Sequence, residues 1–182
     1  IRVEFLNVDG LTTMQNMFYG CSNLTHVNAS DWNTSNITNM SGLFRNCTSL
    51  LAVEGIGDWD VSNVENMSSL FEACHALPRL NLTDWNTESA TDFSNLFLDC
   101  FVITSIGNIS NWDTRNVTKL DSMFAYTLEM EEINLLNWNV EKVATATYMF
   151  NVSTSTHRIK RIDLSNWNVG NVIDMSYMFN NC

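Results

Sequence analysis

The fold is decided by one stretch, Asp31-Trp32-Asn33-Thr34-Ser35-Asn36-Ile37-Thr38-Asn39-Met40-Ser41-Gly42-Leu43-Phe44, because its arrangement of Trp and Phe recurs along the chain. The six tryptophans are separated by 27, 26, 27, 26 and 29 residues, and a phenylalanine follows each of them after 12 residues. The pairs are Trp32 and Phe44, Trp59 and Phe71, Trp85 and Phe97, Trp112 and Phe124, Trp138 and Phe150, and Trp167 and Phe179, and Phe18 extends the series backwards. A fixed period of this length is the signature of a stacked-repeat protein, so we expect these rings to form its structural core.

Each unit begins with a short alternating segment. In residues 77–85 the apolar side chains follow the pattern L-x-x-L-x-L before Trp85. A period of two over so few residues predicts a short strand with one buried face. Two units carry one extra residue in this segment, beside Gly55 and Gly107. Glycine at an inserted strand position predicts a β-bulge.

The second half of each unit has helical spacing. Between Ile37 and Leu50 the apolar side chains recur at steps of 3, 3, 1, 3 and 3, which predicts one stripe on a helix of about three turns. The segment 33–36 before it offers several candidates for the helix N-cap. Each unit is therefore predicted to run strand, Trp-bearing turn, helix and turn, and to bury its apolar faces only by stacking on its neighbours.

These units predict an α/β solenoid, a leucine-rich-repeat-like, right-handed coil of strand-turn-helix repeats of about 26 residues. Neighbouring strands lie about 4.8 Å apart whereas helices need about 8–10 Å, so we expect a parallel sheet on the concave face. A single repeat array is expected over residues 1–182. It comprises a partial unit 1–23, units 24–49, 50–76, 77–102 and 103–129, a unit 130–158 with a short insertion, and a truncated unit 159–182.

The stretch from Asp31 to Phe44 resembles the W-[ND]-[TV]-x-N-V-x-x-M-x-x-M-F core of BspA-like leucine-rich repeat surface proteins, and the similarity covers essentially the whole chain. The resemblance implies secreted or cell-surface repeats that attach to host molecules or to other cells. The unit after Trp138 departs from the pattern, since Glu141 and Lys142 replace the usual x-Asn pair and Ala146 replaces a Met. These departures do not affect the predicted fold.

Composition and charge exclude several classes of function. Nine Lys and Arg against 20 Asp and Glu give a net charge of −11, which disfavours binding to nucleic acid or to anionic membranes. No apolar run approaches the roughly 20 residues that span a bilayer, so we expect no direct membrane insertion in this segment. The chain shows no signal-peptide pattern at Ile1, so any targeting signal is expected to have been removed or to lie outside this sequence.

The sequence offers no catalytic, cofactor-binding or metal-binding motif, and we expect no enzyme activity and no cofactor. Cysteines stand three residues after the phenylalanines, at Cys21, Cys47, Cys74, Cys100 and Cys182, with Thr127 and Ser153 in the remaining units. On neighbouring helices about 9 Å apart they would not reach one another, so free, buried, structural thiols are predicted. The three histidines, His26, His75 and His157, occupy unrelated positions in the repeat.

The tryptophan column has two alternative interpretations. The indoles either stack inside the turn, while flanking Asn and Asp bind backbone donors, or they form an exposed strip for stacking on sugars. Asp31, Asp58 and Asp84 form an acidic column beside it that offers oxygen ligands to Ca²⁺. The same column continues as Asn in the later units, which lowers its charge, so we expect no metal site.

The concave strand face is the better candidate for a binding site, because residues between the buried positions point outward. The candidate ligand-facing residues are Asn28, Asn81, Asn134, Asp163, Ser30, Thr83, Ser110 and Ser165. Near the strand starts lie Thr25, His26, Arg79, Ser105, Glu131, Glu132, Lys160 and Arg161. Asn28 and Asn81 also begin N-x-[ST] sequences, which in a secreted eukaryotic protein would place glycans on this face.

The leading functional hypothesis is a non-enzymatic, extracellular or cell-surface module that mediates adhesion by binding a protein or a glycan on another cell or host surface. The alternative hypothesis is a structural spacer or filament subunit, built by end-to-end self-association of the repeats. The polar strand face favours the first hypothesis, and the absence of a polar cap at either end of the sequence favours the second.

Overall fold

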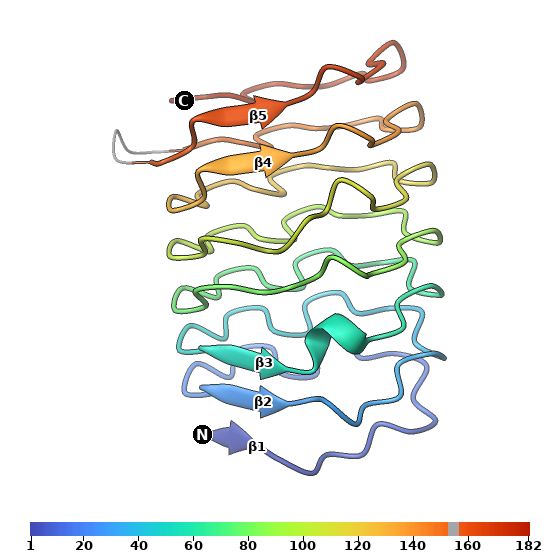
Figure 1. Ribbon diagram of the computed structural model, residues 1–182, viewed down its shortest axis with the longest axis vertical. Helices are drawn as coiled ribbons and strands as arrows, with labels where there is room; N and C mark the ends of the chain where they lie inside the picture. Colours follow the sequence, from blue (N-terminus) through green and yellow to red (C-terminus); the bar gives the residue numbers. More distant parts are fainter. Residues whose placement is uncertain (153–156) are drawn as a thin grey trace.

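The computed structural model describes residues 1–152 and 157–182, and the chain in it winds into a stack of coils (Figure 1). On one side of the stack lie the strands β1 (Arg2–Val3), β2 (His26–Asn28), β3 (Ala52–Glu54), β4 (Glu132–Asn134) and β5 (Arg161–Asp163). They form two small parallel sheets, of order β1-β2-β3 and β4-β5. Residues one repeat apart are register partners, as Val27 and Val53 are, so the period of the sequence is the length of one coil.

The other side of the stack also joins coil to coil through the backbone. A column of single parallel bridges links Thr13, Asn39, Asn66, Asp92, Lys119, Thr145 and Asp174, each to the next. In the residues that follow each bridge, the main-chain N–H of every second residue donates to the following coil. Examples are Met40 N to Asn66 O at 2.9 Å and Phe44 N to Leu70 O at 2.9 Å. Both sides of the coil are therefore held at the spacing of paired strands.

The predicted helices are absent, and the strand-turn-helix solenoid of leucine-rich-repeat type is wrong. Across residues 1–152 and 157–182 the helical structure amounts to η1, a single 3-10 turn over Ile56–Asp58. The segment predicted as a helix is a series of turns in which Leu43 N donates to Met40 O at 3.2 Å and Cys47 N to Phe44 O at 3.0 Å. An α-helix would instead join each N–H to the carbonyl four residues earlier.

Left-handed residues break up the helical backbone in each of these segments. In the second coil Gly42 has φ 64° and Asn46 has φ 61°, two residues before and two residues after Phe44. The next coil repeats the arrangement with Ser69 and Ala73, at φ 57° and 58°. A right-handed helix requires negative φ throughout, so two such residues per coil turn the chain through corners instead of winding it helically.

The expected concave face also disappears, because its curvature depended on helices being wider than strands. Main-chain pairing occurs on both sides of the stack, so the difference in width between strands and helices that would have curved it is absent. We call the side that carries β1 to β5 the strand face.

The core consists of stacked columns of like residues. Trp32, Trp59, Trp85, Trp112 and Trp138 are at most 7% exposed, and successive indole rings lie 5.5 to 6.4 Å apart. Phe44, Phe71, Phe97, Phe124 and Phe150 are fully buried in a second column with spacings of 5.7 to 5.8 Å. In the first and last coils, where a ring has a neighbouring coil on one side, Phe18 and Trp167 are half-buried and Phe179 is 49% exposed. The insertion predicted within 130–158 includes residues 153–156, which lie outside the described residues.

Candidate functional site on the strand face

The predicted ligand-facing residues lie on the strand face, but most of them serve the backbone. The side-chain oxygens of Asn28, Asn81, Asn134 and Asp163 each accept the N–H of the second residue along the chain, at 3.2, 3.4, 3.2 and 3.2 Å. Those donors include Ser30, Thr83 and Ser165 from the second predicted column. The two columns therefore form Asx turns, which fix where each coil leaves its strand.

Exposure separates the predicted residues further. Asn81, Asn134, Ser30 and Ser165 are exposed, whereas Asn28, Thr83 and Asp163 are half-buried. Ser110 is only 6% exposed, because it closes the turn in which its N–H donates to Asn108 Oδ1 at 3.1 Å. Ser110 is thus removed from the candidate surface.

The strand face is interrupted where the first extra residue occurs. Gly55 has φ 77° and leads from β3 into η1, and a Cβ on it would lie 2.3 Å from Ser30 Cα. In the described part of the chain, no main-chain hydrogen bond joins the segment 51–57 to the segment 78–81 of the next coil. A groove of 560 Å³ opens between these two segments. The inserted glycine therefore ends the sheet in place of the simple bulge that the sequence predicted.

Unpaired polar groups line this first groove. Neither the N–H nor the C=O of Arg79 and Asn81 makes a main-chain hydrogen bond within the described segments, while Leu80 N between them donates to Ser105 O at 2.9 Å on the far side. The Arg79 side chain is exposed and forms no ion pair with any described residue. The groove thus combines free backbone donors and acceptors with an available guanidinium.

A second break lies at the other extra residue. Gly107 has φ 83°, and a Cβ on it would lie 2.6 Å from both Asn81 Oδ1 and Thr83 Oγ1. No main-chain hydrogen bond joins the segment 106–109 to β4 among the residues that the structure describes. A groove of 250 Å³ follows, lined by residues of both segments that include Glu132 and Asn134. The two breaks divide the strand face into its two small sheets (Figure 1).

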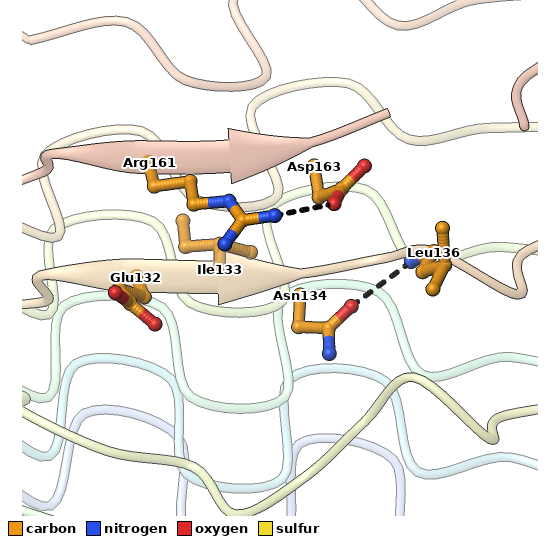
Figure 2. A pocket seen from close by; sticks show the side chains of 6 residues that line it. All are labelled: Glu132, Ile133, Asn134, Leu136, Arg161 and Asp163. Atoms are coloured by element: carbon orange, nitrogen blue, oxygen red, sulfur yellow. Dashed lines mark hydrogen bonds and ion pairs between the residues drawn. The ribbon is translucent and has the colours of Figure 1, made fainter. Parts of the chain in front are cut away.

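Beside the second groove, charged side chains gather over β4 and β5. Figure 2 shows the Arg161 guanidinium over the gap between the two strands, and its Nη2 lies 2.9 Å from Asp163 Oδ2. The Ser165 hydroxyl, which donates to Asp163 Oδ1 at 2.8 Å, and then Arg161 lower the pKa of the Asp163 carboxyl. Glu132 and Asn134 complete a hollow of 170 Å³. Exposed Glu132 has no ion-pair partner within the described ranges.

Two further ion pairs tie these coils together. Arg158 Nε lies 2.9 Å from Glu129 Oε2, and Lys160 Nζ lies 2.8 Å from Glu131 Oε2. Both pairs are largely exposed, so each contributes little to stability. The Lys160–Glu131 pair and the Arg161–Asp163 pair commit three of the charges predicted near the strand starts to the protein itself, which leaves Arg79 and Glu132 as the charges available to a partner.

The tryptophans are not a ligand-binding strip. The indole N–H of Trp85 donates to Ile56 O at 2.9 Å, and Trp112 and Trp138 repeat the contact at 3.0 and 2.8 Å with Leu82 O and Ile109 O. Because these rings are buried, they are closed to a sugar.

The acidic column beside the tryptophans lies at the surface of the stack. Asp31, Asp58 and Asp84 are exposed, and residues 1–152 and 157–182 contain no group of three or more His, Cys, Asp or Glu side chains that could hold a metal ion. In the same residues no helix is long and apolar enough to cross a bilayer.

Comparison with known proteins places the chain in one family. A family model described as "Mycoplasma protein of unknown function, DUF285" matches residues 12–105 and again residues 99–182. Neither a curated protein nor a solved structure matches the chain. Together the two family matches cover residues 12–182.

Proposed function

The chain belongs to the family described as Mycoplasma protein of unknown function, and on that premise we propose that it is a non-enzymatic, extracellular or cell-surface module that binds a protein partner through its strand face. The observation that carries the proposal is the pair of breaks in the strand ladder at Gly55 and Gly107. A free backbone donor or acceptor beside a strand is a template for pairing with an extended segment of another chain.

Side-chain chemistry supports a partner that carries both charges. Arg79 borders the first groove and Glu132 the second, both exposed and without an ion pair to a described residue. A partner that places an acidic side chain near Arg79 and a basic one near Glu132 would satisfy both. Complementary charges of this kind steer association and fix the register of a complex more than they add affinity.

A protein is favoured over a glycan because the aromatic rings that could stack on a sugar lie inside the coil. Trp32 to Trp138 are buried, and the polar atoms of the Asn and Asp columns are partly used in Asx turns. The resemblance of the repeats to BspA-like surface proteins supports adhesion and a cell-surface location, and both remain part of this proposal.

The test is adherence of the purified, fluorescently labelled chain to cultured animal cells. The double variant Arg79→Glu/Glu132→Lys reverses both available charges and leaves the net charge at −11. We expect it to lower saturable adherence about tenfold. The matched control Glu65→Lys/Lys142→Glu makes the same exchange at exposed positions away from the strand face, and we expect it to adhere like the wild type. Equal adherence of both variants, or adherence removed by glycosidase treatment of the cells, would contradict a protein-binding strand face.

A second candidate function is a structural spacer or self-assembling filament subunit. It is favoured by the parallel main-chain pairing of successive coils, because a stack of this kind can be extended by further coils. Electron microscopy of the purified chain distinguishes the functions, because fibres support assembly and dispersed particles support the binding module.

A further inference from the structure

The cysteines form a column that crosses the stack. Cys21, Cys47, Cys74 and Cys100 each follow a column phenylalanine by three residues in four consecutive coils, and all of them are free thiols. The sequence predicted that they are too far apart to react, on the assumption of helices about 9 Å apart. That assumption is wrong, because main-chain hydrogen bonds between neighbouring coils lead directly up to these cysteines, as in Gly20 N to Arg45 O, Asn46 N to Glu72 O and Ala73 N to Leu98 O.

Hydrogen bonds place Cys47 directly against Cys21. The main-chain N–H of Cys21 and the thiol of Cys47 both donate to Phe18 O, at 3.0 and 3.1 Å. Beside them, Gly20 N donates to Arg45 O at 2.8 Å, which holds the two coils in parallel register. Paired strands lie about 4.8 Å apart, and a disulfide requires Cα atoms separated by about 4.4–6.8 Å. The backbone therefore already has the spacing that a disulfide needs.

Burial gives the two thiols different accessibility. Cys21 is exposed, whereas Cys47, Cys74 and Cys100 are fully buried. Burial is also the main reason why the pKa of Cys47 rises to about 12, so that this thiol is neutral at pH 7. A dissolved oxidant therefore reacts with the Cys21 thiol first, and the buried Cys47 thiol reacts only with the mixed disulfide formed on Cys21.

We propose that Cys21 and Cys47 are an oxidative modification site, at which a small-molecule disulfide converts two thiols into one disulfide between the first and second coils. The Cys21 thiolate attacks one sulfur of the small disulfide, forms a mixed disulfide and releases one small thiolate. Cys47 then gives up its proton and attacks Cys21 Sγ, so that the second small thiolate leaves. Two cysteines are oxidised and one disulfide molecule is reduced to two thiols.

The chain contains its own control in Cys182. This cysteine is exposed and its thiol donates to Phe150 O at 3.1 Å, the same contact that Cys47 makes with Phe18. The sequence, however, places Ser153 instead of a cysteine one unit earlier. A mixed disulfide on Cys182 therefore has no neighbouring thiol to resolve it.

The experiment is incubation of the full chain with oxidised glutathione, followed by peptide mapping with mass spectrometry. We expect a Cys21–Cys47 disulfide-linked peptide pair that lacks glutathione, together with stable glutathionylation of Cys182. The variant Cys47→Ser should instead retain glutathione on Cys21. A hydroxyl suits this position, because Thr127 occupies it in another coil and donates to Phe124 O at 2.8 Å.

The pH dependence tests the order of the steps. Because Cys47 has a pKa of about 12, its thiolate fraction rises about tenfold per pH unit between pH 7 and pH 9, and loss of glutathione from Cys21 should accelerate accordingly. Stable glutathionylation of Cys21 in the wild-type chain, to the same extent as Cys182 and with no linked peptide pair at either pH, would overturn the proposal.

Discussion

Replacement of Trp85 tests whether the tryptophan column holds the coils together. Trp85 is 3% exposed, its ring lies 6.4 Å from Trp59 and 5.9 Å from Trp112, and its N–H donates to Ile56 O. Truncation of a buried Trp to Ala costs about 3–5 kcal/mol, and the carbonyl that loses its donor adds about 1–3 kcal/mol. We therefore expect Trp85→Ala to lower the free energy of unfolding by about 4–8 kcal/mol, much of the stability of an ordinary domain.

A pair of conservative variants separates the ring from its hydrogen bond. Trp85→Phe keeps an aromatic ring in the column but leaves Ile56 O without its donor. Trp32 is also buried, at 7% exposure, but its indole nitrogen has no hydrogen-bond partner among the described residues. We expect Trp85→Phe to be more destabilising than Trp32→Phe by about 1–3 kcal/mol, the cost of leaving a buried acceptor without its donor.

Urea denaturation followed by far-ultraviolet circular dichroism measures all three variants without relying on Trp fluorescence. The comparison requires that the slope of the free energy against urea concentration stays constant, so that the midpoints report stability alone. A loss below about 1 kcal/mol for Trp85→Ala would refute the column as the source of stability. Equal losses for the two Phe variants would refute a role for the indole hydrogen bonds.

Three further predictions concern the turns. Gly55→Ala should lower the free energy of unfolding by about 2–5 kcal/mol, because its Cβ would strike backbone of the neighbouring coil. Gly20→Ala, also left-handed but in open space, should cost only about 1 kcal/mol, so equal losses in thermal unfolding would contradict this view. Burial raises the pKa of Asp99, so the charged carboxylate destabilises the fold at pH 7. Asp99→Asn should therefore raise the urea midpoint at pH 7. This gain should shrink as the pH falls through the raised pKa of Asp99. The Ser62 hydroxyl lowers the pKa of Asp60. The contribution of the Asp60 carboxylate to folding stability is therefore complete above about pH 4 and is lost as the pH falls further. Melting curves from pH 2 to pH 6 should show a smaller decrease in melting temperature at low pH for Asp60→Asn than for the wild type.

The repeat period and the buried positions could be predicted from the sequence, but the helices could not. Ile37, Met40, Leu43, Phe44 and Cys47 are all fully buried, as an apolar stripe requires. Their steps, however, are almost all of three residues, whereas a helix of 3.6 residues per turn alternates steps of three and four. Steps of three also fit a chain that turns a corner every third residue, which is what the hydrogen bonds show. The spacing of the apolar residues is therefore compatible with an α-helix and with a series of corners, and the helical propensity of the residues does not distinguish the two.

The left-handed corners carry no sequence signal that would have corrected this prediction. The equivalent position two residues before the column phenylalanine holds Asn16, Gly42, Ser69, Asn95, Ser122, Tyr148 and Tyr177, all with positive φ. Gly and Asn favour this conformation, whereas Ser and Tyr do not. Pairing with the adjacent coils imposes the conformation on them, and a tertiary constraint of this kind cannot be recognised in one unit.

The position of the candidate site could be predicted in part, but the main-chain contacts of its polar side chains could not. Asn28 and Asn81 begin N-x-[ST] sequences on the strand face, and their side-chain oxygens accept the N–H of Ser30 and Thr83. Asn66 shows the same contact with Ser68, at 2.9 Å. A short side-chain acceptor two residues before a hydroxyl residue is also the pattern of an Asx turn, and a repeat that needs one such turn at each corner will contain many of these sequences by structural necessity.

The candidate binding surface is therefore found at the two coils that carry an extra residue, where the regular pairing between coils is interrupted. In each regular coil the polar side chains cap turns and the backbone groups pair with the next coil, so little remains free to bind a partner. One extra residue, with Gly55 or Gly107 at its corner, shifts the chain so that neighbouring backbone groups lose their partners. The sequence showed both insertions and predicted a local bulge at each. It could not show that each insertion would end a sheet, because that outcome depends on the pairing of the following coil, and the two grooves that result are the places where this surface differs from a uniform stack.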